Sequence, residues 1–342
     1  MTVPLPPPPS PEPQKRARIS LPPILPAAPP AAGDVRVLAQ RVIENVETVI
    51  VGKREQITLA LAVLLAEGHL LVEDVPGVAK TMLARAIAAS AGCSFKRIQC
   101  TPDLQPQDVL GEASFDAQTG RTEFRFGPLF SQFVLVDEIN RASPRTQSAL
   151  LEAMGEGMVT AGNVSYRLQK PFMVMATQNP VEQEGTFRLP EAQKDRFLAR
   201  MSIGYPSAAD EKRMVERFRR GHPIEALQPV ATPDLVLKCQ EATRGVPVAD
   251  EVNEFILHIV RATRSHPALV LGASPRASLG LYRAGQAMAA IRGEDRVSAA
   301  LIGDLAAFIL PHRLIVRGDG AQSNRNAGEI VGEIVLRPGR AA

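Results

Sequence analysis

The sequence predicts a three-layer α/β domain with a mainly parallel β-sheet, followed by a smaller helical domain. Short apolar runs that suit buried strands occur at residues 69–72, 133–136 and 172–176, and segments with helical periodicity separate them. After Tyr205 the strand signal disappears, and residues 208–316 keep a helical period. The length of 342 residues also exceeds what one hydrophobic core usually organises, so two domains are expected.

The two ends of the chain are expected to be tails. Residues 1–33 contain runs of proline, cannot bury a core and are expected to sample extended polyproline conformations. This segment is either inert or a ligand for a proline-reading domain. The predicted boundaries are therefore a proline-rich tail at 1–33, an α/β core at 34–205, a helical domain at 206–317 and a C-terminal tail at 318–342.

The charge of the chain limits what it is expected to bind. Lys plus Arg number 39 and Asp plus Glu number 36, a net charge of +3. The proline-rich tail holds +2 of this charge, because Lys15, Arg16 and Arg18 stand against Glu12. The rest of the chain is close to neutral, which argues against strong binding to nucleic acid, since that binding depends on Lys and Arg at the phosphates.

The sequence also predicts a cytoplasmic protein without a membrane span. The longest apolar run, around residues 57–66, is shorter than the roughly 20 residues that a bilayer span needs. The N-terminus lacks the basic start and apolar stretch of a signal peptide. Cys93, Cys100 and Cys239 show neither disulfide nor metal-site spacing, and the histidines are expected to be structural.

A candidate phosphate-binding loop follows the first predicted strand. Residues 35–50 and 53–67 have the pattern of amphipathic helices, the strand at 69–72 follows them, and residues 73–81 then lead into a helix predicted at 82–91. Backbone N–H groups and a helix N-terminus after a buried strand suit an anion. In such a loop Lys80 would reach the outer phosphates and the Thr81 hydroxyl would ligate Mg²⁺.

The loop departs from the strict phosphate-loop pattern at two positions. Asp74 and Ala79 stand where that pattern has glycine. Ala79 is the milder change, because it adds one methyl group at a close approach. On these residues alone, a surface turn with an incidental Gly-x-x-Lys remains the alternative.

An acidic pair ends the second apolar strand. Asp137 and Glu138 follow the run at 133–136, 57 positions beyond Lys80. A strand that delivers two carboxylates at its C-terminal end suits Mg²⁺ binding by Asp137, through water, and activation of the attacking water by Glu138. The alternative is a helix-capping turn, which the phosphate loop makes the weaker interpretation.

The third apolar strand ends in a polar segment with Asn179 before a proline. If the second and third strands are neighbours in the sheet, this amide lies beside the acidic pair and is able to hold water or sense the γ-phosphate. The alternative is a simple turn, which Asn-Pro often makes.

Together these segments resemble the MoxR family of AAA+ ATPases. The resemblance rests on Val51-Gly52, the loop at 76–81, the segments 137–142 and 189–197, and a further match at 272–277, in the family's order from about residue 35 to about 317. It implies a five-stranded sheet with a helical lid, ATP between core and lid, and a ring that is usually a hexamer. Asp74 and Ala79 fall within what the family tolerates.

The resemblance also assigns roles to individual residues. Asn179 matches the first nucleotide sensor, and Arg276 matches the second sensor, which links the position of the lid to the γ-phosphate. Arg196 matches the arginine finger given to the neighbouring subunit's ATP. The alternatives are that Arg196 pairs with Glu191 and that Arg276 caps a helix. The implied contacts to ATP and Mg²⁺ come from Val51, Gly52, Asp74, Val75, Pro76, Gly77, Val78, Ala79, Lys80, Thr81 and Asp137, with Thr81 and Asp137 at the metal.

Two hairpins are expected as insertions in the core. Residues 111–128 and 158–168 each read as strand, turn and strand, with alternating Phe124 and Phe126 in the first and Tyr166 in the second. They are either mobile ribbons that engage a substrate protein or ribbons that merely pack on the core.

Three functions follow from these features. The first is an ATP-hydrolysing chaperone that remodels or matures a client complex or metalloenzyme, with a von Willebrand factor A-domain partner as the family implies. The second is an ATPase motor on nucleic acid, which the near-neutral body and the mixed charge of residues 111–127 disfavour. The third is a nucleotide-gated scaffold that barely hydrolyses ATP, which intact Glu138 and Arg196 argue against.

Overall fold

The computed structural model describes residues 32–116, 121–161, 164–179, 187–219, 221–318 and 326–336. The tail expected at 1–33 falls almost wholly outside these residues, and so do the tips of both expected hairpins. Within the described part of the chain, no helix is long and apolar enough to cross a membrane.

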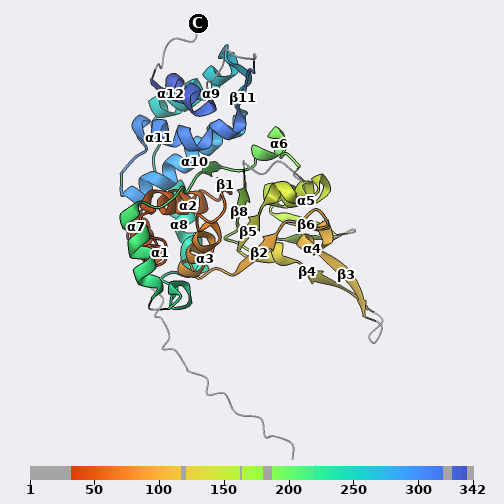
Figure 1. Ribbon diagram of the computed structural model, residues 1–342. Helices are drawn as coiled ribbons and strands as arrows, with labels where there is room; N and C mark the ends of the chain where they lie inside the picture. Colours follow the sequence, from red (N-terminus) through yellow and green to blue (C-terminus); the bar gives the residue numbers. More distant parts are fainter. Residues whose placement is uncertain are drawn as a thin grey trace, which may run out of the picture.

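A five-stranded parallel sheet forms the centre of the molecule (Figure 1). The runs predicted at 69–72, 133–136 and 172–176 are three of its strands, which confirms the α/β class. An edge strand on each side completes the sheet. The strands, in their order across the sheet, are β2 (Phe95–Gln99), β5 (Phe133–Asp137), β8 (Met173–Gln178), β1 (Leu70–Glu73) and β9 (Ala199–Met201).

Alternate residues of the central strands enter two separate cores. Phe133 and Leu135 of β5 join the cluster formed with the helices on one face, whereas Val134 and Val136 join the cluster on the other face. This is the three-layer arrangement, since each face of a buried sheet needs a cover of helices. The helices on the first face are α1 (Ala32–Glu47), α2 (Arg54–Leu65) and α3 (Lys80–Ser90), and those on the second are α4 (Pro106–Leu110) and α5 (Pro144–Glu156).

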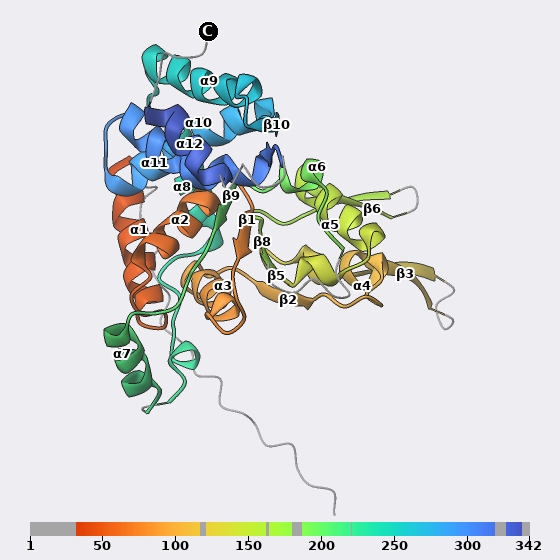
Figure 2. The same cartoon turned by 45° about the horizontal axis from the view of Figure 1, so that its top comes forward.

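The chain after β9 is mostly helical, and it packs against the core rather than standing apart (Figures 1 and 2). Its apolar residues belong to the same cluster as those of α1 and α2, so one continuous core joins the two regions. The helices are α7 (Ala208–Phe218), α8 (Pro233–Arg244), α9 (Asp250–Ser265), α10 (Pro275–Arg292), α11 (Ala299–Ile309) and α12 (Ala327–Leu336).

Two features of this helical region differ from the sequence expectation. A short antiparallel pair, β10 (Leu269–Leu271) and β11 (Ile315–Val316), lies among the helices. The segment expected as a C-terminal tail contains α12, which buries Ile330, Val331 and Ile334 in the common core. The helix forms because these apolar residues recur at the spacing of one helical face.

Both predicted hairpins are present and extend from the sheet away from α9, α10, α11 and α12 (Figure 2). An aromatic cluster joins them: Phe124 stacks on Tyr166 with ring centroids 4.6 Å apart, and Phe126 contacts both Tyr166 and Phe130. Phe126 is nevertheless 57% exposed. The strands are β3 (Gly111–Asp116) with β4 (Arg121–Phe126), and β6 (Met158–Ala161) with β7 (Val164–Arg167).

Candidate active site

The phosphate loop lies at the C-terminal end of β1 and runs directly into α3. Helix α3 begins at Lys80, two residues before its predicted start, so Lys80 and Thr81 stand in its first turn. Gly77 has a φ of +86°, which glycine adopts without strain, and Ala79 has a φ of +64°. Ala79 therefore has a left-handed backbone, which is unfavourable for a residue with a Cβ. This explains why the strict pattern has glycine at this position.

Asp74 braces the loop instead of facing the phosphate position. Its Oδ2 accepts hydrogen bonds from Ser202 Oγ and from the backbone N–H groups of Ile203 and Gly204, at 2.9, 2.6 and 2.7 Å. Burial would raise the pKa of Asp74, but these hydrogen bonds outweigh it and hold the pKa below its usual value. The side chain therefore ties the start of the loop to the segment that follows β9.

The Lys80 side chain turns back on the loop. Its Nζ donates to the carbonyl of Asp74 at 2.7 Å. Burial lowers the pKa of Lys80, while the charges of Asp137, Asp74 and Glu138 act in the opposite direction. The acidic pair lies at the same end of the sheet as the phosphate loop, because β1 and β5 both flank β8 as parallel strands.

Asp137 and Glu138 end β5, and Thr177 of the neighbouring strand β8 orients both. The Thr177 hydroxyl donates to Asp137 Oδ1 at 2.6 Å and accepts from the Glu138 backbone N–H at 2.9 Å. Glu138 has a φ of +57°, an unfavourable conformation for a residue with a Cβ, and the Thr177 contact helps to hold it. Thr177 cannot be recognised from the sequence, because a threonine in a buried strand carries no signal of its own.

The strand next to β5 on its other side supplies further partners. Arg97 of β2 donates to Asp137 Oδ2 from Nε at 3.1 Å and from Nη2 at 2.6 Å. Gln99 Nε2 donates to Glu138 Oε2 at 3.1 Å, and Arg141 Nη1 reaches the same oxygen at 3.0 Å. Both carboxylates are thus hydrogen-bonded to groups that sequence reasoning did not identify.

The remaining residues expected at the nucleotide lie around this edge of the sheet. Asn179 follows β8 and is buried, and β5 and β8 are neighbours, which is the condition under which its amide lies beside the acidic pair. Val51 and Gly52 form the turn between α1 and α2. Gly52 has a φ of +71°, and a Cβ there would meet the Asp210 carboxylate at 2.2 Å, so the turn requires glycine.

The residues at this edge fit Mg²⁺ bound with a nucleotide. Asp137 offers a carboxylate and Thr81 a hydroxyl, which are the hard oxygen donors that Mg²⁺ prefers. Among the described residues no group of three or more His, Cys, Asp or Glu could hold a metal alone. Mg²⁺ at nucleotide sites is usually held by one or two carboxylates together with substrate phosphates and water.

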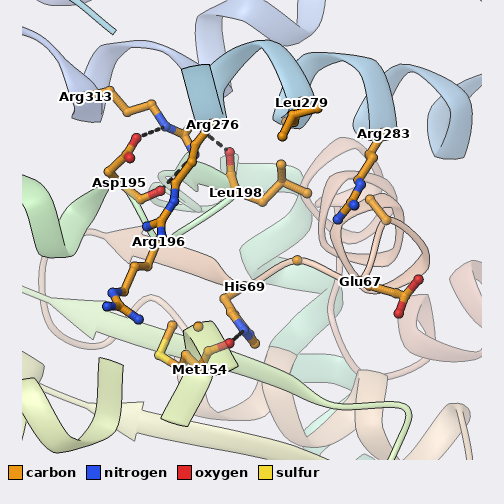
Figure 3. A pocket seen from close by; sticks show the side chains of 14 residues that line it. Glu67, His69, Met154, Asp195, Arg196, Leu198, Arg276, Leu279, Arg283 and Arg313 are labelled. Carbon is orange, nitrogen blue, oxygen red and sulfur yellow. Dashed lines mark hydrogen bonds and ion pairs between the residues drawn. The ribbon is translucent and has the colours of Figure 1, made fainter. Parts of the chain in front are cut away.

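Arg196 and Arg276 lie together at the opposite edge of the sheet (Figure 3). They line one pocket of about 250 Å³ with Arg283, Asp195 and residues that immediately precede β1 and β9. The strands are parallel, so this pocket is at their N-terminal ends, whereas the phosphate loop is at their C-terminal ends. A strand of four residues at about 3.3 Å per residue separates the edges by roughly 13 Å.

Arg196 does not pair with Glu191, and the Arg276 side chain does not cap α10. Arg196 Nη1 donates to the carbonyl of Leu151 at 2.6 Å, while Glu191 pairs with Lys194 of the short helix α6 (Glu191–Lys194) at 2.9 Å. The cap of α10 is Ser274, whose hydroxyl accepts from the Arg276 backbone N–H at 3.1 Å. The Arg276 side chain is exposed and extends into the pocket (Figure 3).

A buried ion pair joins the two arginine-bearing segments. Asp195 Oδ1 accepts from Arg313 Nε at 2.9 Å, and its Oδ2 accepts from Ser274 Oγ at 2.8 Å. Arg313 is 5% exposed and also donates to the carbonyls of Phe197 and Leu198. The loop of Arg196 and the start of α10 are therefore held together (Figure 3).

His69 forms part of the floor of the same pocket. Its Nδ1 accepts from the Val174 backbone N–H at 3.0 Å, so Nε2 carries the proton and donates to the Met154 carbonyl at 3.1 Å. Burial lowers the pKa of His69 to about 4, which keeps the ring neutral. These contacts are structural, as the sequence analysis expected of His69.

Comparisons with known proteins agree with this architecture. Residues 69–199 match the ATPase family associated with various cellular activities (AAA), and residues 261–334 match the AAA lid domain. Chaperone MoxR1 of Mycobacterium tuberculosis is 41% identical over 317 residues, which cover 89% of this chain and 81% of that protein. Protein YeaC of Bacillus subtilis is 48% identical over 302 residues, 88% of this chain and 94% of that protein. A solved structure of a candidate ATPase from Cytophaga hutchinsonii has a TM-score of 0.83 at 35% identity, covering 89% of this chain and 95% of that one.

The parallel sheet, the phosphate loop beside an acidic pair and the helical lid define an ATPase of the AAA+ class. Such an enzyme hydrolyses ATP to ADP and phosphate. The similarity to MoxR1 extends over most of both chains. The chain therefore belongs to the MoxR family of AAA+ ATPases, as its motifs predicted.

Proposed function

We propose that this chain is the motor subunit of a ring that uses ATP hydrolysis to remodel a protein client. The observation that carries the proposal is the separation of two half-sites. One edge of the sheet has Lys80, Thr81, Asp137 and Glu138, and the other has Arg196 beside Arg276. Neither half-site is complete alone, and subunits placed edge to edge would bring them together.

At the nucleotide edge, each side chain has a proposed task in ATP hydrolysis. Lys80 binds the outer phosphates, and Thr81 and Asp137 hold Mg²⁺, which neutralises charge on the phosphoryl group when bound. Glu138 accepts a proton from the attacking water, and Asn179 orients that water or the γ-phosphate. Val51 and Gly52 contact the base, while Val75, Pro76, Gly77, Val78 and Ala79 shape the loop around the phosphates.

At the other edge, Arg196 and Arg276 are proposed to act on the ATP of the neighbouring subunit. A guanidinium given in trans compensates charge that develops on the transferring phosphoryl group. The resemblance assigns Arg276 to a sensor of the γ-phosphate, and its shared pocket with Arg196 supports a role across the same subunit boundary. A hexamer is the ring size that the family implies.

The client is proposed to be a protein complex or metalloenzyme, with a von Willebrand factor A-domain protein as partner. The exposed Phe126 and the aromatic cluster around it provide a surface for protein rather than for phosphate. A relative carries the name chaperone. A motor on nucleic acid is the second candidate, and the near balance of 39 basic and 36 acidic residues disfavours it.

Capture of bound proteins tests the remodelling function. Glu138→Gln should bind ATP and retain a client or partner in the native cell, because the phosphate contacts remain while the base is lost. Lys80→Ala is the matched control, which should bind neither ATP nor client. Glu138→Gln with wild-type turnover would contradict the catalytic assignment. ATPase activity stimulated by DNA at physiological ionic strength would favour the nucleic-acid motor.

A further inference from the structure

The guanidinium of Arg97 occupies one oxygen of the carboxylate that is expected at the metal. Two of its nitrogens, Nε and Nη2, donate to Asp137 Oδ2, at 3.1 and 2.6 Å. The other oxygen, Oδ1, accepts from Thr177 at 2.6 Å. The Asp137 side chain is only 11% exposed, so water can solvate little of its charge. Arg97 supplies a counter-charge to this carboxylate.

The geometry of β2 directs Arg97 to this position. Side chains alternate along a strand, so Arg97 and Gln99 share one face of β2 while Lys96 and Ile98 share the other. The register pairs Gln99 with Asp137 and Arg97 with Leu135, which places Arg97 diagonally opposite the carboxylate. Ile98 is buried in the core of the opposite face. The direction of Arg97 therefore follows from the burial of Ile98.

Arg97 also reaches the second carboxylate of the pair through Gln99. Arg97 Nη2 donates to Gln99 Oε1, and Gln99 Nε2 donates to Glu138 Oε2 at 3.1 Å. Glu138 is thus linked to the same guanidinium as Asp137. A substitution of Arg97 is therefore expected to alter the hydrogen bonding of both carboxylates.

A magnesium ion and a guanidinium carry charge of the same sign and seek the same oxygen donors. An arginine cannot lose its proton in a protein, so its charge remains while the metal approaches. Arg97 is 47% exposed, which lets it leave Asp137 for water without a buried, unpaired charge. Release of Arg97 is therefore possible within this fold.

We propose that Arg97 is a resident counter-cation of the metal site, which competes with Mg²⁺ for Asp137 and sets the Mg²⁺ concentration at which nucleotide is bound. The proposal rests on the assignment of Asp137 to the metal under the proposed function. It adds that Arg97 balances charge on Asp137 and reaches Glu138 through Gln99 until the metal displaces it. Arg97 must give up Asp137 Oδ2 before the metal site is formed.

The test is a Mg²⁺ titration of full-length protein with a fluorescent ADP analogue at fixed concentration. Arg97→Gln removes the competing charge, so the half-saturating Mg²⁺ concentration should fall by about fivefold or more, the lower range of coupling between linked sites. Arg97→Lys keeps the charge but has one donor group, so its value should lie between the other two. The same order should appear when Mn²⁺ binding is followed by electron paramagnetic resonance.

Lys96→Gln is the matched control, because it removes the same charge from the same strand on the face away from Asp137. Its half-saturating Mg²⁺ concentration should equal that of the wild type. An unchanged or higher value for Arg97→Gln would overturn the proposal, since an arginine that merely orients Asp137 would weaken metal binding when lost. The titration needs no client or ring, so failure to capture a client would contradict the remodelling function and leave this result intact.

Discussion

Two residues of the nucleotide edge keep a left-handed backbone although neither is glycine. Ala79 has a φ of +64° and Glu138 a φ of +57°, each at a cost of about 1–2 kcal/mol. Ala79 directly precedes α3, and Glu138 directly follows β5. Backbone strain of this kind therefore occurs where the loop enters α3 and where the acidic pair leaves β5, and Glu67, which precedes β1, also has a positive φ of +55°.

Asp74 departs from the strict motif, and its side chain holds the loop through hydrogen bonds. A glycine here would leave the N–H groups of Ile203 and Gly204 without the carboxylate that now accepts them. The sequence showed that Asp74 breaks the pattern, but its partners lie 128 to 130 positions away in the chain. Only the pairing of β1 with β9 brings them together.

A prediction about acid stability follows from the lowered pKa of Asp74. Asp74→Asn should lower the free energy of unfolding at pH 7 by about 1–3 kcal/mol, because hydrogen bonds to a charged acceptor become neutral ones. A carboxyl group whose pKa is depressed by folding stabilises the protein above its unfolded pKa, about 3.9. That contribution is lost as the pH falls through the lower folded value.

The measurement is urea unfolding of wild type and Asp74→Asn from pH 7 downwards. The difference in free energy should be constant near neutrality and should shrink once the pH falls below about 4. Ser202→Ala removes only one of the hydrogen bonds to Asp74 and serves as the smaller reference change. A difference that grows on acidification would mean that Asp74 is not stabilised as a carboxylate.

At the scale of single residues, the motifs singled out the candidate site residues but not the groups that hydrogen-bond to them. Lys80, Asp137 and Glu138 stood out because their proposed tasks require given residue types next to a strand end. Thr177 and Arg97 could not be found, because a residue becomes a partner only through strand register, which a single sequence does not contain.

Among the elements, the buried strands were the most predictable. Strands β1, β5 and β8 lie in the middle of the sheet and read as continuous apolar runs. The edge strand β2 has exposed Lys96 and Arg97, and β9 has only three residues, so neither has a clear apolar pattern. Helix α12 was missed because its ten residues include Gly328 and Gly332, which are weak helix formers, and because a short apolar segment carries little signal without its packing partners.

The hairpins pose the question of whether their aromatic residues bind protein or fill space. Phe124 is partly buried and stacks on Tyr166, so Phe124→Ser should cost about 1–3 kcal/mol of stability through lost packing and the aromatic pair. Phe126 is 57% exposed, so Phe126→Ser should change the melting temperature little. If the ribbons engage the client, Phe126→Ser should keep basal ATPase activity and lose stimulation by client or partner.

Leu336 provides the control for this experiment. It is 82% exposed on α12, away from the hairpins, so Leu336→Ser removes an exposed apolar side chain of similar character without touching the aromatic cluster. Stimulation should persist in that variant. Full stimulation of Phe126→Ser, with an unchanged melting curve, would show that this ring does not contact the client.

The whole molecule places its candidate catalytic residues at two edges of one sheet, while its two regions share one core. The phosphate loop and acidic pair stand at the C-terminal edge, and the Asp195–Arg313 ion pair holds the arginine edge to the lid. Residues of α1, α2 and the lid helices belong to one apolar cluster. Because a close-packed interior transmits strain, a shift of the lid is expected to displace the helices that cover the sheet. Nucleotide binding at one edge is thereby expected to alter what the other edge presents to its neighbour.

The division between edges leads to a prediction about mixed rings. Arg196→Ala should retain ATP binding but lose hydrolysis, by about 10³-fold or more on the scale of such arginine fingers. Glu138→Gln should be inactive for a different reason, the loss of its base. In a ring that contains both variants, a subunit with intact Glu138 can receive Arg196 from a Glu138→Gln neighbour. Co-expressed mixtures should therefore recover part of the wild-type ATPase activity, whereas each variant alone should not.

Co-expression is the suitable format because subunits must assemble together, and affinity tags of two kinds select the mixed rings. Arg283→Ala removes another arginine from the same pocket. Comparing its ATPase activity with that of Arg196→Ala tests whether the loss of hydrolysis is specific to Arg196. Absence of rescue in rings shown to contain both variants would place Arg196 outside the active site.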